Sequence, residues 1–463
     1  MDRRDFLKSS AAALTVASTG RFSLAREGQR AAGRPNILFI MTDQQHAGML
    51  SCAGNSSVRT PAMDALAAEG MRFERAYCAN PVCVPSRTAM ATGIMPGRLG
   101  AFNNGTGLRI DPPPEAAANS LGLLMKRAGY DTFYGGKVHM CKALTPLQHG
   151  YDEYFRNERE KLPGACVKFI RKKRDRPFFA VASFINPHDI CYADDGRMAS
   201  VRALMKRGAA LPPDRLPPLP PNHEPASGEP DGLIAYLADR TQAGNSRAEL
   251  RRKYTERDWR LYRWAYARLT EKVDGEIGNL LDGLRAAGLE ENTLILFTSD
   301  HGNMDACHKL ISKQLFYEES VRVPLIVRRK GATPAGVDAS HLVSTGLDIL
   351  PTLCDYAGIA APAGLLGRSL RPIVEGKPVS DWRTYVPSEN DMGRMIRGPR
   401  YKYFVYGSGA SREFLADLQT DPGEMHNLAA APAMASVLGD HRRMLKEWAE
   451  KSGDRKAGKF LAA

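Results

Sequence analysis

Four stretches of apolar residues, each followed by polar side chains, constrain the fold of this chain more than any other feature. They are residues 36–41, 131–134, 178–184 and 293–297. Continuous apolar runs of this length are typical of strands that are buried on both faces of a parallel sheet. Segments 119–128 and 258–287, between these runs, have the apolar spacing of helices. The alternation predicts an α/β fold: a large doubly wound, mainly parallel sheet flanked by helices.

The polar residues that follow the four runs are rich in groups that can carry chemistry. In chain order they are Asp43, Gln44, Lys137, His139, His188, Asp300 and His301. In open α/β sheets, ligands bind at the carboxyl ends of the strands. We therefore expect these side chains to converge on one edge of the sheet and to form a site there.

The pattern of apolar and polar residues changes near residue 371. Short alternating segments such as 401–406 follow, with turn signals at 407–409 and 421–423 and an amphipathic pattern over 433–451. This pattern predicts a smaller C-terminal α+β subdomain, an antiparallel sheet plus a helix. The predicted organisation is a catalytic domain over residues 34–370 and a C-terminal subdomain over residues 371–463. A length of 463 residues and a hydrophobic content of 43% suffice for both cores.

The N-terminus reads as a targeting segment rather than as part of the fold. A twin-arginine pair, Arg3-Arg4, precedes an apolar stretch over 11–18 and a small-residue cleavage site at 23–25. Residues 1–25 are therefore predicted to be a twin-arginine signal peptide, with the twin-arginine translocase as a partner. The apolar stretch is too short for a stable membrane anchor. The expected location of the mature protein is the periplasm or the outside of the cell.

Charge and cysteine content narrow the classes of partner. The formal net charge of +13 favours anionic partners. No zinc-finger spacing, RNA-binding aromatic run or basic heptad pattern is present, so no nucleic-acid partner is expected.

The eight cysteines include no Cys-x-x-Cys pair, and their even number in an exported protein leads us to expect disulfides.

One short motif identifies the chemistry. The run from Cys83 to Gly93 reads CVPSRTAMATG and resembles the signature of the formylglycine-dependent sulfatases, a family within the alkaline-phosphatase-like superfamily. The resemblance extends over residues 35 to about 454, including the segments around Asp43, Lys137 and Asp300. It implies a sulfuric ester hydrolase with an alkaline-phosphatase-like fold. It also implies that a sulfatase-maturing enzyme oxidises Cys83 to formylglycine.

The resemblance implies a covalent mechanism. Hydrated formylglycine carries two geminal hydroxyl groups, of which one attacks the sulfur atom of the substrate. The other hydroxyl then loses its proton, so that the aldehyde forms again and sulfate leaves. A serine or an unmodified cysteine lacks this second hydroxyl.

The resemblance also implies a divalent cation, with ligands from residues that follow the first and fourth apolar runs. The implied ligands are Asp43, Gln44, the modified Cys83, Asp300 and His301. Oxygen-rich ligands favour Ca²⁺, which is the expected ion. Gln44 stands where many relatives have aspartate, and the imidazole of His301 is a softer ligand, so Mg²⁺ and Mn²⁺ stay open.

The same resemblance assigns the remaining catalytic roles. Arg87 is expected to brace the formylglycine and the metal ligands, while Lys137 and Lys313 hold the sulfate oxygens. His139 is the expected base for collapse of the covalent intermediate. His188, together with Lys313, is the expected acid for the leaving alcohol.

Substrate contacts and substrate class are less constrained. Asn104 and His308 are the expected substrate-binding residues, and a sulfated carbohydrate is the expected natural substrate. One alternative is a phosphonate or phosphate ester hydrolase of the same superfamily, although those relatives have Tyr and Thr where this chain has Lys137 and His139. The other alternative is a protein that binds sulfated glycans without cleaving them.

Overall fold

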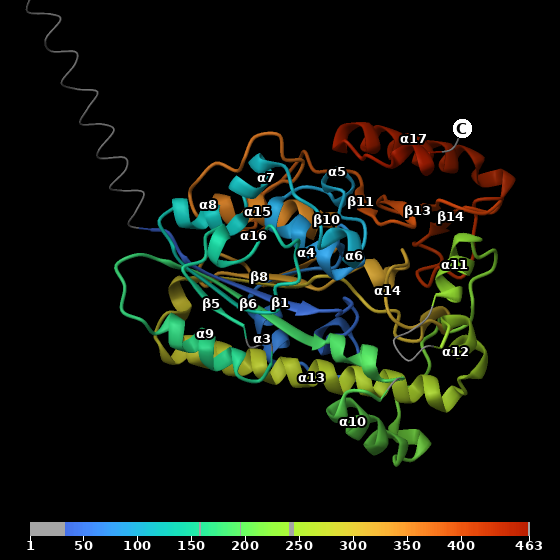
Figure 1. The fold of residues 1–463 in the computed structure, drawn as a ribbon, viewed down its shortest axis with the longest axis horizontal. Coiled ribbons are helices and arrows are strands. Elements are labelled where there is room, and N and C mark those ends of the chain that lie inside the picture. Colours follow the sequence, from blue (N-terminus) through green and yellow to red (C-terminus); the bar gives the residue numbers. More distant parts are fainter. Residues whose placement is uncertain (1–32, 157–158, 195, 240–244, 462–463) are drawn as a thin grey trace, which may run out of the picture.

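The computed structural model describes residues 33–156, 159–194, 196–239 and 245–461 (Figure 1). The predicted signal peptide, residues 1–25, lies outside the described residues. Within the described part of the chain, no helix is long and apolar enough to cross a membrane.

An eight-stranded sheet forms the centre of the molecule, with the strand order β5-β4-β6-β1-β7-β8-β2-β9. Its strands are β1 (Asn36–Asp43), β2 (Met71–Phe73), β4 (Asp131–Gly136), β5 (Glu153–Phe155), β6 (Phe178–Pro187), β7 (Thr293–Ser299), β8 (Leu325–Arg328) and β9 (Gly336–Asp338). The four predicted strands are β1, β4, β6 and β7, and they lie side by side and run parallel. Strand β8 is antiparallel to β7 and to β2, so the sheet is mixed but mainly parallel.

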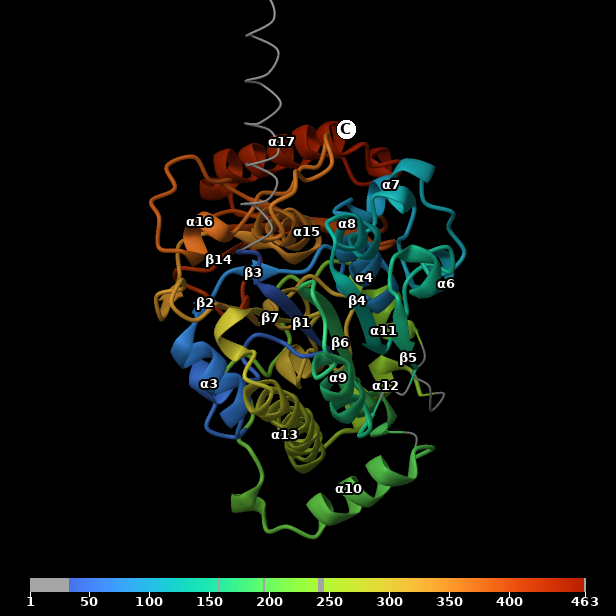
Figure 2. The same ribbon diagram turned by 90° about the vertical axis from the view of Figure 1, so that its left-hand side faces the viewer.

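Helices cover both faces of this sheet (Figure 2). One layer contains α3 (Pro61–Glu69), α9 (Leu162–Ile170) and α13 (Glu256–Ala286). The other layer contains α4 (Cys83–Thr92), α8 (Leu121–Arg127) and α15 (Thr345–Tyr356). Successive residues of β1 point into the two cores in turn, Phe39 into one and Ile40 into the other. Burial on both faces explains the continuous apolar run and confirms the predicted doubly wound class.

The long helix begins slightly earlier than its apolar pattern. Helix α13 starts at Glu256 because Thr255 caps it: the Thr255 hydroxyl accepts from the Asp258 backbone N–H, and the Asp258 carboxylate accepts from the Thr255 N–H. Such a capping box satisfies two N–H groups that otherwise lack partners at a helix start.

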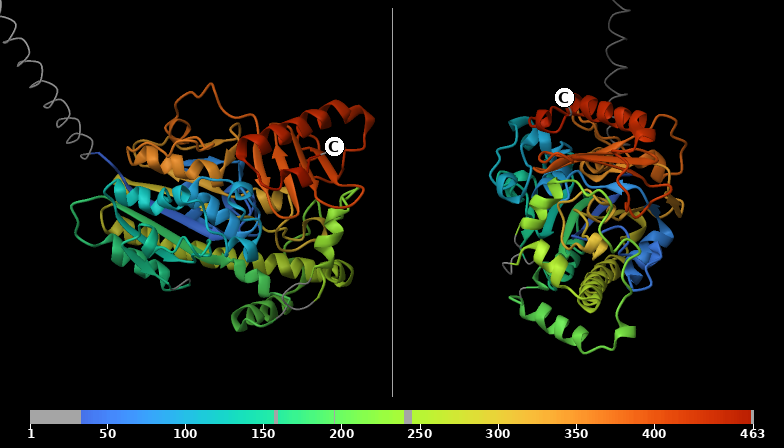
Figure 3. Two further views of the ribbon diagram at one scale, coloured as in Figure 1. Left: turned by 45° about the horizontal axis from the view of Figure 1, so that its top comes forward. Right: turned by 90° about the vertical axis from the view of Figure 1, so that its right-hand side faces the viewer.

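The C-terminal part forms a second, antiparallel sheet next to the first (Figure 3). Its strands are β11 (Val386–Glu389), β12 (Gly393–Arg397), β13 (Tyr401–Tyr406) and β14 (Glu413–Asp417), and helix α17 (Ala435–Ser452) follows. This confirms the predicted antiparallel sheet and helix. The exact domain boundary at residue 371 stays a prediction.

Short elements connect these layers. They are β3 (Ala76–Tyr77), β10 (Val343–Ser344), α5 (Pro96–Leu99), α6 (Asn104–Gly107), α7 (Pro114–Ala118), α10 (Ala199–Ala209), α11 (Gly232–Ala238), α12 (Arg247–Lys253), α14 (Glu318–Val321) and α16 (Arg371–Val374).

The expectation of disulfides is wrong. All eight cysteines lie within the described residues, and all are free thiols. Cys78, Cys166 and Cys354 are fully buried, where burial raises the pKa of each thiol. These three behave as small apolar residues of the core. Cysteine count alone cannot show pairing, because pairing requires Cα atoms within about 7 Å of each other.

Candidate active site

The carboxyl ends of the four parallel strands meet at one edge of the sheet, as expected. Asp43 is the last residue of β1, and Asp300 directly follows β7. Lys137 directly follows β4, and its Nζ lies 2.8 Å from the Asp43 carboxylate. His188 directly follows β6, and its Nε2 lies 4.0 Å from Oδ1 of Asp43. Lys137 and His188 come from distant parts of the chain, yet both contact the carboxylate of Asp43.

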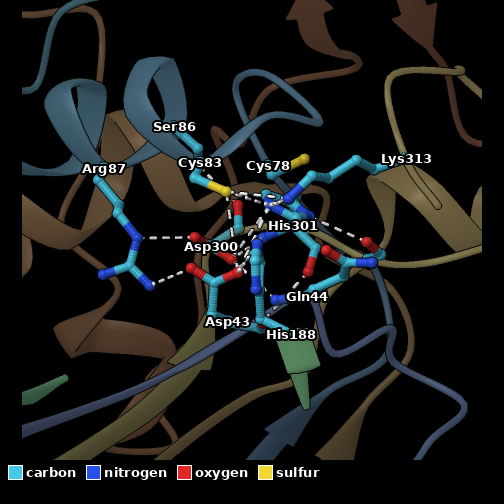
Figure 4. Close-up of polar contacts among 12 residues, drawn as sticks. Asp43, Gln44, Cys78, Cys83, Ser86, Arg87, His188, Asp300, His301 and Lys313 are labelled. Carbon is cyan, nitrogen blue, oxygen red and sulfur yellow. Dashed lines mark hydrogen bonds and ion pairs between the residues drawn. The ribbon is translucent and has the colours of Figure 1, made fainter. Parts of the chain in front are cut away.

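Four potential metal ligands form a compact, buried cluster at this edge (Figure 4). One ligand atom from each of Asp43, Cys83, Asp300 and His301 lies within 4.8 Å of the others, and all four residues are fully buried. Cys83 is the first residue of α4, and its Sγ lies 3.1 Å from Nε2 of His301. Position 83 carries the thiol here, and Sγ lies where the motif implies the oxygens of a formylglycine. Two carboxylates beside an imidazole fit a divalent cation.

Gln44 lies beside the cluster in a left-handed backbone conformation, with φ of 68°. Its backbone N–H donates to Oδ1 of Asp300 (3.0 Å), and its side-chain Nε2 donates to Asn303 (3.0 Å). The Cys191 thiol donates to the side-chain amide oxygen of Gln44 (3.2 Å). Its role as a metal ligand stays a prediction.

Arg87 holds the two carboxylates of the cluster together. Its Nε donates to Asp300 (2.7 Å), and its Nη2 donates to Asp43 (2.8 Å). The third nitrogen, Nη1, donates to the Ser183 hydroxyl (2.7 Å) and to the Lys137 carbonyl (3.1 Å). A planar guanidinium can make such directed bonds to several acceptors at once. Arg87 therefore fixes the positions of Asp43 and Asp300 relative to each other.

Two lysines add positive charge where the substrate would meet residue 83. Nζ of Lys313 lies 3.0 Å from Sγ of Cys83 and 3.3 Å from Nε2 of His301. Burial and the charge of Asp43 act to raise the pKa of the Cys83 thiol. The positive charges of Lys313 and Lys137 oppose that rise and, with His301, hold the pKa well below its usual range. The site is thus built to stabilise negative charge at position 83.

The two histidines assigned to proton transfer lie in different settings. Burial and the nearby charge of Lys137 lower the pKa of His188 to about 4, so the free site holds this imidazole neutral near pH 7. His139 is partly exposed, has a positive φ of 38°, and has a buried Nδ1 without a hydrogen-bond partner among the described residues. The roles of both residues stay predictions.

Of the two expected substrate-binding residues, one lies beside position 83 and the other is buried. Asn104 begins α6, and its Oδ1 accepts from the Val84 backbone N–H (3.0 Å) next to residue 83. His308 is fully buried, and its ring stacks on Tyr317 with centroids 4.0 Å apart. Asn104 therefore borders the site. A substrate contact for His308 stays a prediction, and the ring of His308 is not exposed.

A cavity of about 250 Å³ lies next to the cluster and is bordered by His188 and Lys313, which contact it. Its lining includes Asn104, His188, Cys191, Arg247, Tyr262 and Lys313. Sequence reasoning missed Cys191, which lies three residues after His188, and Arg247, which begins α12. It also missed Asn303, two residues after His301, which receives hydrogen bonds from Gln44 and from the Tyr262 hydroxyl (3.1 Å). Closeness to the strand ends was the available signal for Cys191 and Asn303; Arg247 had none.

Comparison with known proteins agrees with this geometry. The sulfatase family model matches residues 35–359, and the model of the N-sulphoglucosamine sulphohydrolase C-terminal region matches residues 306–451. A Δ4,5-hexuronate-2-O-sulfatase from Bacteroides thetaiotaomicron is 30% identical over 93% of this chain and 92% of its own length. An ulvan-active sulfatase from Formosa agariphila is 29% identical over 91% of this chain and 82% of its own length.

Solved structures give the same result. The structure of a 2-O GAG sulfatase has a TM-score of 0.80 and 28% identity, over 93% of this chain and 95% of that chain. The shared fold and the buried Asp, Cys and His cluster define a hydrolase of the alkaline-phosphatase-like superfamily. The chain belongs to the sulfatase family. It is a sulfuric ester hydrolase.

Proposed function

We propose that this enzyme releases sulfate from a sulfated carbohydrate, with formylglycine derived from Cys83 as the nucleophile and one divalent cation as cofactor. The observation that carries the proposal is the position of Cys83. Its Sγ lies within 3.8 Å of Asp43, His301 and Lys313, and Lys313 also lines the cavity. The first residue of a helix thus meets two potential metal ligands and a cation that can bind sulfate.

Asp43, Gln44, Asp300 and His301 would hold the cation together with the modified residue 83. Ca²⁺ is the proposed ion, and Mg²⁺ and Mn²⁺ are the alternatives. A bound dication would lower the pKa of the nucleophilic hydroxyl and offset the charge of the sulfate group. Gln44 requires a rotation of its side-chain amide to offer its oxygen, because that oxygen now accepts from Cys191.

Four side chains of the protein would bind the sulfate group and transfer protons. Lys137 and Lys313 would bind the sulfate oxygens, because both ammonium groups reach the cluster, Lys137 from the end of β4 and Lys313 from the segment between β7 and α14. His139 would take the proton from the second formylglycine hydroxyl. His188 is neutral in the free site, and a bound sulfate anion would raise its pKa so that it can protonate the leaving alcohol.

The proposed substrate is a 2-O-sulfated hexuronate unit of a glycosaminoglycan-type saccharide. The support is the similarity, over nearly the full chain, to a relative that acts on a Δ4,5-hexuronate 2-O-sulfate. The formal net charge of +13 suits such a polyanionic source. Asn104, beside residue 83, would position the sulfated sugar, as would His308 if its loop opens.

Export through the twin-arginine translocase completes the proposal. That route carries folded proteins, so the sulfatase-maturing enzyme must convert Cys83 in the cytoplasm before the chain folds. The mature enzyme would then act in the periplasm or outside the cell, where polymeric saccharides are available.

The first test is the mass of the Cys83 peptide from protein produced together with a sulfatase-maturing enzyme. We expect the mass of an aldehyde at position 83 and hydrolysis of an aryl sulfate that Cys83→Ala abolishes. Cys52→Ala, at a partly exposed thiol outside the site, is the matched control and should stay active. A panel of sulfated disaccharides, with 2-O-sulfated unsaturated hexuronate and N-acetylglucosamine 6-sulfate, then identifies the position cleaved.

Two outcomes would redirect the assignment. A matured enzyme that hydrolyses a phosphonate monoester faster than every sulfate ester would support the phosphonate hydrolase alternative. An unmodified thiol, under conditions that convert a control sulfatase, would support the non-catalytic glycan-binding alternative.

A further inference from the structure

A second, larger cavity lies at the opposite edge of the central sheet. It has a volume of about 900 Å³ and borders the amino ends of the strands: Asn36 begins β1, Phe178 begins β6, and Asn292 directly precedes β7. The active site lies at the carboxyl ends of the same strands. Strand β1 has eight residues, which at ~3.3 Å per residue separates the two cavities by roughly 26 Å.

Basic residues dominate the lining of this cavity, which we call the basic cavity. They are Arg34, Arg171, Lys172, Lys173, Arg174 and Arg176, and Asp175 is the acidic residue in the lining. Two acidic neighbours bind part of this charge: Asp131 lies 2.8 Å from Arg176, and Glu153 lies 2.6 Å from Lys172. Six basic against three acidic groups leaves a net charge of about +3 in one hollow.

The segment that carries these charges is anchored at both ends. It joins the end of α9 at Ile170 to the start of β6 at Phe178, and Figure 1 shows α9 at the side of the sheet away from α14. The guanidinium of Arg174 lies over the Phe169 ring (4.5 Å) and the Phe178 ring (5.3 Å), and it donates to the Phe169 carbonyl (2.5 Å). Arg174 thus fixes the segment to the core.

Several of the cationic groups remain available to a ligand. The side chains of Arg171 and Lys173 are exposed, and among the described residues neither makes a side-chain hydrogen bond or an ion pair. Arg176 is 65% exposed despite its contact with Asp131. Nε of Arg34 is buried without a hydrogen-bond partner. An anion in the cavity could bind Arg171 and Lys173 without displacing an ion pair of either residue.

We propose that the basic cavity is a second binding site, which holds a sulfated polysaccharide chain away from the active site. The identity of the ligand rests on the proposed function, which makes such a chain the source of the substrate. Four of the six basic residues are arginines, whose planar guanidinium groups pair with the oxygens of sulfate through two parallel hydrogen bonds. A polymer bound here would raise the effective concentration of its ends near the active site.

The test compares two double charge reversals in the Cys83→Ala background, where no sulfate is released. Arg171→Glu with Lys173→Glu alters the basic cavity, while Lys446→Glu with Lys451→Glu alters two exposed positions on α17 by the same charge. Heparin binding is measured by calorimetry at several salt concentrations. We expect at least a ten-fold loss of affinity and a shallower salt dependence for the cavity variant alone. In the catalytically competent background, both variants should hydrolyse a small aryl sulfate at the parent rate.

Equal heparin affinity of the two double variants would overturn the proposal. Retained heparin binding with lost binding to phosphatidylglycerol vesicles would assign the cavity to a membrane surface instead, and would also overturn it. The test is separable from the proposed function: loss of all sulfate ester hydrolysis by matured enzyme would contradict that function without changing the heparin comparison.

Discussion

Nζ of Lys313 lies 3.0 Å from Sγ of Cys83, although 230 positions separate the two residues in the chain. Lys313 lies in the segment between β7 and α14, and its neighbours Ser312 and Gln314 both have positive φ, of 72° and 85°. Such conformations cost of order 1 kcal/mol each for residues other than glycine. This strained segment delivers a buried ammonium group to the nucleophile position.

Replacement of Lys313 should therefore impair the chemical step. We expect Lys313→Ala to lower kcat for an aryl sulfate by roughly 10²–10³-fold, because a preplaced charge that stabilises the transferring group is lost. Lys330→Ala, at a partly exposed lysine that pairs with Glu290, is the matched control. Steady-state kinetics on protein with verified formylglycine content measures the effect, and an unchanged kcat would show that Lys313 does not contact sulfate.

Removal of the cation should abolish activity and leave the fold in place. Asp43 and Asp300 keep Arg87 as a partner in the absence of metal, so the chain should stay folded. We expect a chelator to lower Tm, and Ca²⁺ at about 100 times its Kd to restore about 2.7 kcal/mol of stability together with activity. Elemental analysis after chelation provides the control. Full activity of protein shown to be free of metal would contradict the proposed cofactor.

Lys402 should be critical for stability. This lysine of β13 is fully buried, and its Nζ lies 3.0 Å from Glu318 and 2.5 Å from Glu424. Lys402→Met would remove the fully buried cation that Glu318 and Glu424 share and would leave Glu318 with Arg322 as its remaining partner, which costs about 3 kcal/mol. Urea denaturation measures the loss. Lys446→Met, at an exposed lysine of α17, should change the free energy of unfolding by less than about 0.5 kcal/mol.

The same cluster predicts a dependence of stability on pH. Burial raises the pKa of Glu424 to about 8, against the opposing charge of Lys402, while the pKa of Glu318 is lowered to about 2. The folded state therefore keeps a proton on Glu424 that the unfolded chain releases above its usual pKa of 4.5. This contribution to stability is present below pH 4.5 and is lost as pH rises toward 8.

Glu424→Gln keeps a neutral side chain at every pH and should remove this loss. Relative to the variant, we expect the free energy of unfolding of the parent to fall by at least about 1.4 kcal/mol between pH 5 and pH 8. Thermal or urea unfolding at both pH values measures the difference, with the exposed Glu450→Gln as control. Parallel pH profiles of the parent and Glu424→Gln would show that Glu424 is ionised in the folded protein.

Reducing agents should leave the stability of the enzyme unchanged. All eight cysteines are free, so the mature protein, with Cys83 converted, should expose seven titratable thiols in denaturant and the unmodified protein eight. Tm should be the same with and without dithiothreitol. A thiol count lower by two, together with a lower Tm after reduction, would reveal a disulfide.

The twin-arginine assignment predicts where a signal variant accumulates. Replacement of Arg3 and Arg4 by lysine should trap active protein with formylglycine at position 83 in the cytoplasm, because maturation precedes export. Cell fractionation and an aryl sulfate assay measure this, and a variant in Lys8 provides a matched basic control. Efficient export of the double-lysine protein would contradict this route.

The sequence by itself determined the class of fold and the chemistry. Apolar runs such as 36–41 are buried on both sides, and burial on both sides is a local property that a run of residue types reports directly. The carboxyl ends of neighbouring parallel strands lie at one edge of a sheet, so the sequence predicts that Asp43 and Asp300 lie together. The Cys83 motif identified the family because its residues are adjacent in the chain, so the motif is complete without tertiary structure.

Only the tertiary structure decided which distant groups touch. The Cys191 thiol at the Gln44 amide, the Lys313 ammonium at Cys83, and the absence of disulfides among all eight cysteines depend on how loops pack over the sheet. The basic cavity likewise arises where the end of α9 meets the starts of three strands. Packing of this kind depends on contacts between segments far apart in the chain. The periodicity of residue types reports local burial and does not predict those contacts.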